Sequence, residues 1–281
     1  MSGEAFALAL GAAFLHAGWN VLLAGARDSV ATTGALLAFG MLLLAPAVVL
    51  TGAEVSSAAL PYVAASAALE LAYFVLLARA YGGGELSVVY PVARGSAPVV
   101  VLVVGAVGLG AALSVPAALG VLLVAAGVLL IAAAPLRRRG ATGSGREPRR
   151  DVFFGLAIAL PIAGYTLVDS EGLDYADPLA YLLAVTAVCA VGFCGGLLVA
   201  GRGPELRAAL GIRSALTAAA VFGAYALVLA ALELAPAASV AAVRESSVVI
   251  AALLAWLFLG EPRRLGAAAL VCAGVAAIAL G

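Results

Sequence analysis

Two arginines lie inside strongly apolar segments of the sequence, where a full charge is costly. Arg94 stands in YPVARGSAPVVVL (residues 90–102), and Arg244 stands in ASVAAVRESSVVIAALL (residues 238–254). A charged side chain in such a segment needs a partner or a polar cavity. The planar guanidinium also matches the oxygens of a carboxylate or a phosphonate. We therefore expect both arginines to bind an anionic or zwitterionic solute.

Other polar side chains recur at helical spacing in the apolar segments. His16 and Asn20 are four residues apart, Glu70 and Tyr73 are three apart, and Tyr90 precedes Arg94 by four, so each pair shares a helix face. We expect these polar stripes to face one central cavity. The expected substrate-binding residues are Arg94, Arg244, His16, Trp19, Asn20, Tyr73, Tyr90, Tyr165 and Ser247; the expected coupling or counter-ion residues are Glu70, Asp169 and Glu245.

Each assignment has a structural alternative. An arginine can extend its charged head to the membrane interface while its stem stays in the apolar region. Glu70 and Glu245 can be counter-ions with no role in coupling, and His16 can hold two helices together by a hydrogen bond. The aromatic residues, Tyr225 included, can be packing residues. Prolines within the apolar segments can be kinks or hinges.

The composition indicates that these residues lie in a membrane protein. The chain has 281 residues, of which 65% are hydrophobic and 11% are charged, whereas soluble domains carry about 25% charged residues. The mean hydropathy is +1.18. So little charge could not cover the surface of a protein in water, so we expect the lipid bilayer to surround it. A net charge of zero gives no reason to expect nucleic-acid binding.

The sequence contains ten apolar stretches near the length of about 20 residues that a membrane helix requires. The predicted spans are residues 4–25, 30–50, 58–80, 86–106, 115–134, 152–171, 178–200, 213–233, 238–259 and 265–281. Between the fifth and sixth spans lies PLRRRGATGSGREPRRD, whose glycines, prolines and arginines predict a flexible linker. The predicted organisation is a five-helix half at 1–134, a linker at 135–151 and a second half at 152–281.

The two halves contain similar motifs. RGSAPVVVL at Arg94 aligns with RESSVVIAAL at Arg244, and LGAALS at residue 109 aligns with LGEPRR at residue 259. HAGWN at residue 16 aligns more weakly with YTLVD at residue 165. Because five is an odd number of crossings, two such halves must be inverted relative to each other. The predicted fold class is therefore an all-α integral membrane protein with ten transmembrane helices in two inverted repeats, with a site between the repeats.

The placement of arginines predicts the orientation. Arg27, Arg79, the linker cluster, Arg202, Arg207, Arg213, Arg263 and Arg264 all fall on one side of the predicted membrane, whereas the other side carries only acidic residues. The positive-inside rule then places the linker in the cytoplasm and both termini outside. We expect the chain in the inner (plasma) membrane of a bacterium.

The sequence offers little support for an enzyme. It contains no HExxH, GxSxG or P-loop motif, and the cysteines Cys189, Cys194 and Cys272 show no CxxC spacing. We therefore expect no catalytic residue, no metal and no cofactor. Any energy for transport should come from an ion gradient or from the gradient of the solute itself.

The motifs together resemble those of the EamA-type proteins in the drug/metabolite transporter superfamily. The resemblance rests on HAGWN, YPVARGSAPVV, YTLVD, RESSVVIAALLAWLFLGEP and the glycine-bearing last helix of each half, and it covers nearly the whole chain. It implies a ten-helix metabolite transporter. Two features depart from the pattern: Ala111 stands where the first repeat should have an acid, which Glu261 keeps in the second, and the family is often drawn with both termini in the cytoplasm.

We expect a secondary transporter that moves a small anionic or zwitterionic metabolite by alternating access. One alternative is a broad-specificity exporter of drugs or amino acids, whose cavity should be acidic and aromatic. A membrane-embedded enzyme or a sensor of lipid-linked intermediates is a further alternative from another class. Since one chain holds both halves, we expect it to function as a monomer.

Overall fold

The computed structural model describes residues 1–23, 28–83, 86–108, 114–140, 148–250, 253 and 265–280. All regular elements in these ranges are helices, apart from one isolated bridge between Val55 and Ala176. The first half contains α1 (Gly3–Leu23), α2 (Ser29–Thr51), α3 (Leu60–Gly83), α4 (Leu86–Gly108) and α5 (Val115–Gly140). The second contains α6 (Pro148–Gly172), α7 (Pro178–Val199), α8 (Gly203–Ala209), α9 (Ile212–Leu232), α10 (Ala237–Arg244) and α12 (Leu265–Leu280).

The structure confirms an all-helical protein with helices suited to a membrane. Five helical segments in the described ranges are long and apolar enough to cross a bilayer, namely Ser29–Thr51, Ser57–Leu77, Val152–Tyr175, Pro178–Val199 and Ile212–Leu232. Three shorter apolar helices accompany them: Val92–Gly108, Val115–Leu130 and Ala268–Ile278. The total of ten crossings stays a prediction.

Three features differ from the elements expected from the sequence. The helices α5 and α6 extend into both ends of the linker, because leucine and arginine favour helix and Pro148 occupies a first-turn position where its missing N–H costs nothing. A short helix, α8, follows α7. The predicted span 238–259 does not form one continuous helix: α10 ends at Arg244, and a turn at Glu245 separates it from the helical residues 246–250.

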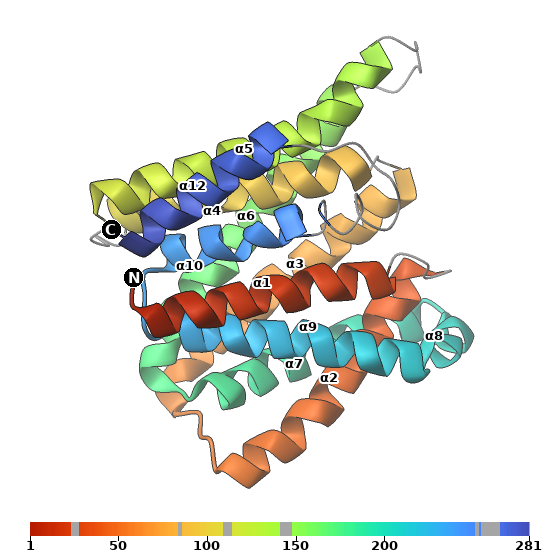
Figure 1. The fold of residues 1–281 in the computed structure, drawn as a ribbon. Helices are drawn as coiled ribbons and strands as arrows, with labels where there is room; N and C mark the ends of the chain where they lie inside the picture. The colour runs from red at the N-terminus through yellow and green to blue at the C-terminus, as the bar shows by residue number, and fades with distance from the viewer. Residues whose placement is uncertain are drawn as a thin grey trace.

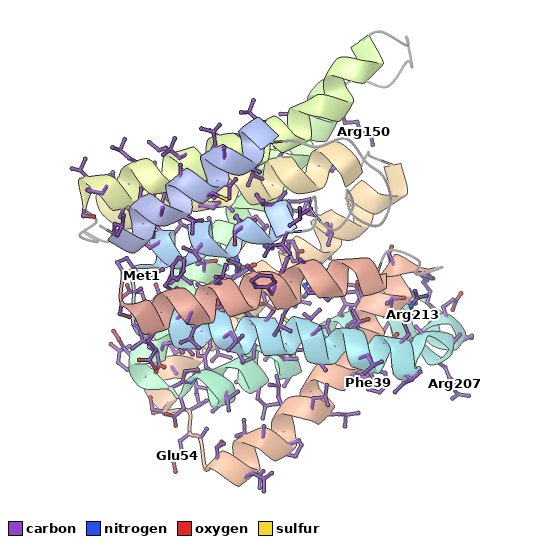
Figure 2. The ribbon with its side chains drawn as sticks, in the orientation of Figure 1. Met1, Phe39, Glu54, Arg150, Arg207 and Arg213 are labelled. Carbon is purple, nitrogen blue, oxygen red and sulfur yellow. The ribbon has the colours of Figure 1, made fainter. Side chains whose placement is uncertain are left out.

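The helices form a bundle with two distinct ends (Figure 1). Both chain termini lie at one end, which we call the terminal end, and α8 with the α5–α6 segment lies at the other, which we call the linker end. Arg150, Arg207 and Arg213 lie at the linker end, whereas Met1 and Glu54 lie at the terminal end (Figure 2). The predicted segregation of basic and acidic residues is therefore present along the bundle. Arg27, Arg79, Arg263 and Arg264 lie outside the described side chains.

Helices from the two halves pack against each other throughout the bundle. The main pairs are α5 with α12, α4 with α6, α1 with α9, α3 with α6 and α2 with α7. The α5–α12 pair crosses at Gly120 and Gly274, where a Cβ on Gly120 would stand 2.6 Å from the carbonyl oxygen of Gly274. Glycine is required here because small residues let two membrane helices approach closely.

The antiparallel pair α2 and α7 is joined at both ends. At the terminal end, the backbone N–H of Ser56 donates to the Tyr175 carbonyl (3.1 Å), and the N–H of Asp177 donates to the Glu54 carbonyl (3.0 Å). At the linker end, Asp28 caps α2 by accepting from the N–H groups of Val30 and Ala31 (3.0 Å each), and it forms an ion pair with Arg202. These contacts hold the two helices as one unit.

Two carboxyl groups outside the membrane-spanning segments have shifted pKa values. The hydrogen bond from the Ala31 amide, supported by Arg202, lowers the pKa of Asp28. At the opposite end of the bundle, burial and the nearby carboxylate of Asp177 raise the pKa of Glu233.

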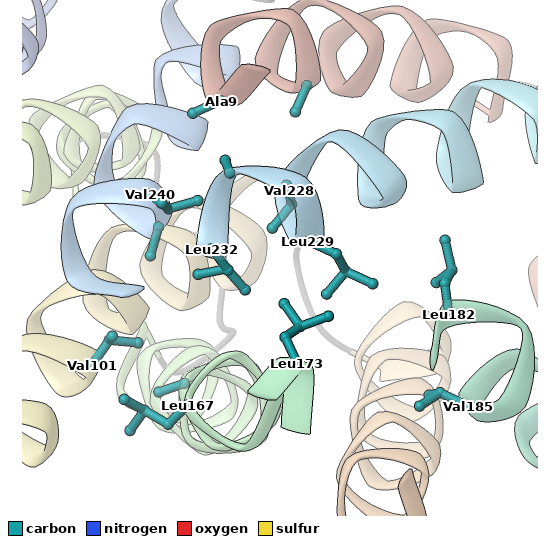
Figure 3. Packing of buried hydrophobic residues seen from close by; sticks show 14 of the residues in the cluster. Ala9, Val101, Leu167, Leu173, Leu182, Val185, Val228, Leu229, Leu232 and Val240 are labelled. Atoms are coloured by element: carbon teal, nitrogen blue, oxygen red, sulfur yellow. The ribbon is translucent and has the colours of Figure 1, made fainter. Parts of the chain in front are cut away.

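A dense apolar core packs the helices against each other (Figure 3). Its buried side chains include Val101 of α4, Leu167 of α6, Leu182 of α7, Leu232 of α9 and Val240 of α10. Burial of such side chains contributes about 1.5–3 kcal/mol each.

Candidate functional site

A cavity of about 130 Å³ lies at the centre of the bundle. The polar and aromatic side chains that line it are His16, Trp19, Thr33, Glu70, Tyr73, Phe74, Arg94, Tyr165, Phe222, Tyr225 and Arg244. They come from α1, α2, α3, α4, α6, α9 and α10, so both halves of the chain contribute. Trp19, Thr33 and Leu77 extend the cavity toward the linker end, because α1 and α3 finish there and α2 begins there.

One carboxylate joins the two arginines. Glu245 is 0% exposed, and Arg94 and Arg244 are 3% and 4% exposed. The Nε atom of Arg94 lies 3.1 Å from Oε2 of Glu245, and the Nε atom of Arg244 lies 3.7 Å from Oε1. Two guanidinium charges share one carboxylate, which leaves one positive charge in excess in this triad. Both arginine side chains are enclosed by the bundle.

Arg244 keeps hydrogen-bonding capacity beyond this ion pair. Its Nη2 atom is buried and has no hydrogen-bond partner among the residues that the structure describes. A buried donor without a partner costs about 1–3 kcal/mol. Because Arg244 lines the cavity, an anionic group placed there would accept the missing hydrogen bond.

The backbone is interrupted beside each arginine. In α4, Pro98 has no N–H to donate to the carbonyl of Arg94 four residues earlier. In the second half, the N–H of Val248 donates to the Glu245 carbonyl (3.0 Å) rather than to that of Arg244. Both helices therefore lose a regular hydrogen bond at the matching position, by different means. Interrupted helices of this kind are typical of transporter sites.

His16 lies between Trp19 and Arg94. The indole Nε1 of Trp19 lies 3.1 Å from Nδ1, and Nη2 of Arg94 lies 2.7 Å from Nε2. Both neighbours can only donate hydrogen bonds, and an imidazolium ring has no acceptor. These contacts favour a neutral ring, which accepts from one of the two neighbours at a time. His16 thus connects α1 with α4.

Two further buried or half-buried carboxyl groups, Asp169 and Glu70, take no part in the arginine triad. Asp169 is 0% exposed, and its Oδ1 accepts from the hydroxyl of Tyr181 at 3.0 Å, while its Oδ2 accepts from the hydroxyl of Tyr225. Glu70 lines the cavity and has the thiol of Cys189 3.6 Å from its Oε2. Among the residues that the structure describes, the observed ion pairs involve other carboxylates.

Three tyrosines form an aromatic wall between the two charged regions. The ring of Tyr165 stands edge-on to Tyr73, with centroids 6.5 Å apart, and to Tyr225, with centroids 6.0 Å apart. Edge-to-face pairs at these distances are favourable beyond simple burial. The wall fixes the positions of the tyrosine hydroxyls relative to Glu70 and Asp169.

The structure brings most of the predicted residues together. The cavity is lined by Arg94, Arg244, His16, Trp19, Tyr73, Tyr165 and Glu70, whereas Glu245, Asp169 and Ser247 are buried but do not line it. The side chains of Asn20 and Tyr90 lie outside the described residues. Roles in binding or coupling stay predictions for all of these residues.

Several residues beside the cavity were missed by the sequence reasoning. Tyr225, Ser66, Tyr181 and Cys189 are absent from the expected substrate-binding and coupling residues, yet all four lie beside Asp169 or Glu70. The four-residue spacing of Ser66 and Glu70 indicates that both side chains share one face of α3, so the sequence could have revealed Ser66. No comparable signal marks the α7 residues, since α7 is apolar throughout.

Among the residues that the structure describes, no group of three or more histidine, cysteine or acidic side chains could hold a metal ion.

The comparisons with known proteins agree with this architecture. Residues 150–280 match the model of the EamA-like transporter family. This part of the chain is therefore similar to the EamA-like transporter family. The resemblance inferred from the motifs is confirmed, and the match implies a membrane transporter of the drug/metabolite transporter type.

A solved structure supports the fold. One crystal structure of a protein superposes with a TM-score of 0.74 at 16% sequence identity, covering 99% of this chain and 96% of that chain. A likeness at this identity concerns the fold alone. The search of curated proteins found no match to this EamA-type chain. The match is consistent with the absence of enzyme motifs, since the matched family is one of transporters.

Proposed function

We propose that this protein is a secondary transporter that moves a small anionic or zwitterionic metabolite by alternating access. The observation that carries the proposal is the arginine triad at the central cavity. Two buried guanidinium groups from matching positions share Glu245, and Nη2 of Arg244 lacks a hydrogen-bond partner among the described residues. A carboxylate or phosphonate group supplies the oxygens that such a fork binds.

The packing supports two inverted repeats, 1–134 and 152–281, joined by the segment 135–151. In such a plan, each contact between a first-half and a second-half helix has a counterpart with the halves exchanged. The contact of α1 with α9 has its counterpart in α6 with α3, and that of α2 with α9 has its counterpart in α7 with α3. The pairs α5–α12, α2–α7 and α4–α10 join corresponding helices directly.

We propose that the structure represents a state closed toward the terminal end. The buried apolar side chains of Leu173, Leu182 and Leu229 pack together near the terminal end, whereas the central cavity reaches Trp19 and Thr33 toward the linker end. The interruptions beside Arg94 and Arg244 supply the points at which α4 and α10 can bend during the transition.

The charge distribution supports the proposed orientation in a bacterial inner membrane. Arg150, Arg202, Arg207 and Arg213 lie at the linker end, which the positive-inside rule assigns to the cytoplasm. Both termini would then face outside. Since one chain supplies both walls of the cavity, the monomer contains a complete site.

The solute class can be tested with the detergent-solubilised protein. A thermal-shift screen against organic acids, amino acids, phosphonates and sugars should show stabilisation by compounds with a carboxylate or phosphonate group, because such groups pair with Arg244. Stabilisation by neutral sugars alone would contradict the proposed site.

A flux assay in liposomes should then follow with any compound that stabilises the protein. Arg94→Gln and Arg244→Gln should each reduce uptake, because a bidentate charged contact is lost. Arg202→Gln is the matched control. Arg202 lies at the surface, with 33% of its side chain exposed, and it does not line the cavity. Its loss should leave uptake near the wild-type level. If Arg94→Gln transports the anionic compound as well as wild type does, the assigned role is wrong.

A broad-specificity exporter of drugs or amino acids is the second candidate. The aromatic lining of the cavity, with Trp19, Phe74 and Phe222 in addition to the tyrosines, favours it. A resistance panel in a pump-deficient host separates the two functions, because only the exporter protects against amphipathic cations.

A further inference from the structure

We propose that a groove on the side of the bundle binds one anionic phospholipid, with an acyl chain in the groove and the phosphate group beside α8. The lipid belongs to the leaflet at the linker end. The groove lies between α2, α3 and α7, and none of its lining residues lines the central cavity. This lipid site is therefore independent of the arginine triad and of the solute.

The groove is apolar and opens sideways from the bundle. Its volume is about 540 Å³, and its walls are formed by Val30 of α2, Leu71 and Val75 of α3, and Phe193 and Leu197 of α7. Val75 is 42% exposed, so the groove is accessible from the surrounding membrane. Among the residues that the structure describes, no polar side chain lines it. Such a lining suits a hydrocarbon chain, because a polar segment would find no hydrogen-bond partner there.

Two glycines of α7 form the floor of the groove. Gly192 and Gly196 are four residues apart, so they share one face of the helix. A Cβ on Gly192 would stand 3.2 Å from a methyl group of Leu71, whereas a Cβ on Gly196 would meet nothing within 4 Å. The groove is therefore narrow at Gly192 and open at Gly196, which lies closer to the linker end.

The length of the groove matches one leaflet. Val30 is the second residue of α2, and Leu197 is the third residue from the end of α7, so both lie near the linker end. Leu71 lies twelve residues before Gly83, the last residue of α3. At a rise of about 1.5 Å per residue, Leu71 is about 18 Å from the linker end of its helix. The hydrocarbon of one leaflet is about 15 Å thick, which is half of the bilayer core.

The mouth of the groove at the linker end is joined to α8. The backbone N–H of Arg202 donates to the carbonyl of Leu197 (2.9 Å), and its side chain forms an ion pair with Asp28, which caps α2. In α8, the side chain of Leu206 lies beside that of Leu197. A Cβ on Gly34 would stand 2.9 Å from Leu197 and 3.0 Å from Leu206. The helix α8 therefore begins where the groove ends.

Arg207 provides an unpaired charge at this mouth. It follows Leu206 directly in α8, is exposed, and forms no ion pair with the residues that the structure describes. Glu205 lies two residues away, a spacing at which helical side chains do not face each other. Arg213, the second residue of α9, is also exposed and unpaired within the described ranges (Figure 2). Arginine binds phosphate oxygens strongly, and two such charges favour a lipid with net negative charge over a zwitterionic one.

Exposed apolar side chains place α8 at the membrane surface. Val199, the last residue of α7, is 92% exposed, and Ile212, the first residue of α9, is 77% exposed. In a bilayer these side chains contact lipid tails, so the hydrocarbon reaches the ends of both helices. The arginines of α8 and its flanks follow directly, at the depth of the phosphate groups.

Native mass spectrometry of the full chain in detergent tests the site. Protein mixed with equal amounts of phosphatidylglycerol and phosphatidylethanolamine should preferentially retain one molecule of phosphatidylglycerol. Arg207→Gln should weaken that binding by about fivefold, as expected for one arginine near a membrane surface. Arg150→Gln is the matched control, because Arg150 is an exposed arginine at the same end of the bundle but away from α8 (Figure 2). Equal retention of the two lipids, or an equal effect of the two variants, would overturn the proposal.

A second pair of variants tests the groove itself. Gly196→Leu places a side chain in the open part of the groove and should reduce the retention of phosphatidylglycerol. Gly195→Leu is the control, because a Cβ on Gly195 also meets nothing within 4 Å but this residue does not line the groove. If the folded Gly196→Leu protein retains the lipid as well as Gly195→Leu does, the acyl chain lies elsewhere and the assignment is wrong. No solute or flux is measured, so this result does not depend on the proposed transport function.

Discussion

Replacing Glu245 by glutamine should destabilise the protein more than any surface charge substitution. The change keeps the shape of the side chain and removes the charge that Arg94 and Arg244 share. At an effective dielectric constant of about 20, a unit charge pair at the two observed separations has a Coulomb energy of about 5 and about 4.5 kcal/mol. Part of this energy is offset by the cost of burying the ions.

The net effect follows from what the substitution leaves behind. Breaking a buried ion pair by removing one partner typically costs about 3–5 kcal/mol, because the remaining charge is uncompensated. Here two guanidinium groups that are nearly inaccessible to solvent would remain. We therefore expect Glu245→Gln to lower the free energy of unfolding by about 3–5 kcal/mol.

The matched comparison is the pair of Asp28 and Arg202. Its side chains are 34% and 33% exposed, and exposed pairs contribute about 0.2–1 kcal/mol. Arg202→Gln should therefore change the melting temperature in detergent only slightly, whereas Glu245→Gln should lower it clearly. Added phosphate should raise the melting temperature of Glu245→Gln more than that of wild type, because an oxyanion can replace the lost carboxylate.

Two results would refute this reasoning. If Glu245→Gln melts at the same temperature as Arg202→Gln, the triad is not the buried, coupled unit that its distances indicate. If the double variant Arg94→Gln/Glu245→Gln is as unstable as the sum of the two single variants, the residues act independently, since coupled sites depart from additivity.

Two further predictions concern the framework around the site. The pKa of Asp28 is lowered in the folded protein, so its contribution to stability is complete above the unfolded carboxylate pKa of about 4 and is lost as the pH falls below that value. The melting temperature should therefore fall less steeply with decreasing pH for Asp28→Asn, which can still cap α2, than for wild type. An unchanged slope would contradict the assignment. Gly120→Ala and Gly274→Ala should each lower stability by about 1–3 kcal/mol, because the new Cβ would stand 2.6 or 2.5 Å from the carbonyl of the facing glycine. Gly266→Ala in α12 meets nothing within 4 Å and is the control; equal melting temperatures for all three variants would show that the helices separate at little cost.

The similarity of Arg94 and Arg244 was readable from the sequence because their flanking motifs repeat. A charge within an apolar segment is conspicuous, and its recurrence in a second copy of the motif predicts a shared environment. Both arginines do line one cavity. The helical character followed in the same way from the length and apolar composition of the segments, and the linker was recognisable from its glycines and arginines.

Other features depended on contacts between residues far apart in the chain. Glu245 was one of several candidate counter-ions, and only the packing of α10 against α4 placed its two oxygens beside both arginines. The break at Glu245 was also hidden, since the segment 238–259 reads as one apolar span.

The clearest division between sequence and structure concerns the tyrosines. Apolar patterns in the sequence set which segments enter the membrane, because the bilayer selects each helix by its own composition. They leave the rotation of each helix undetermined, since a tyrosine suits both a packed interface and a polar site. Tyr225 could therefore be placed beside Asp169 only when α9 was packed against the other helices, which fixes where its hydroxyl points.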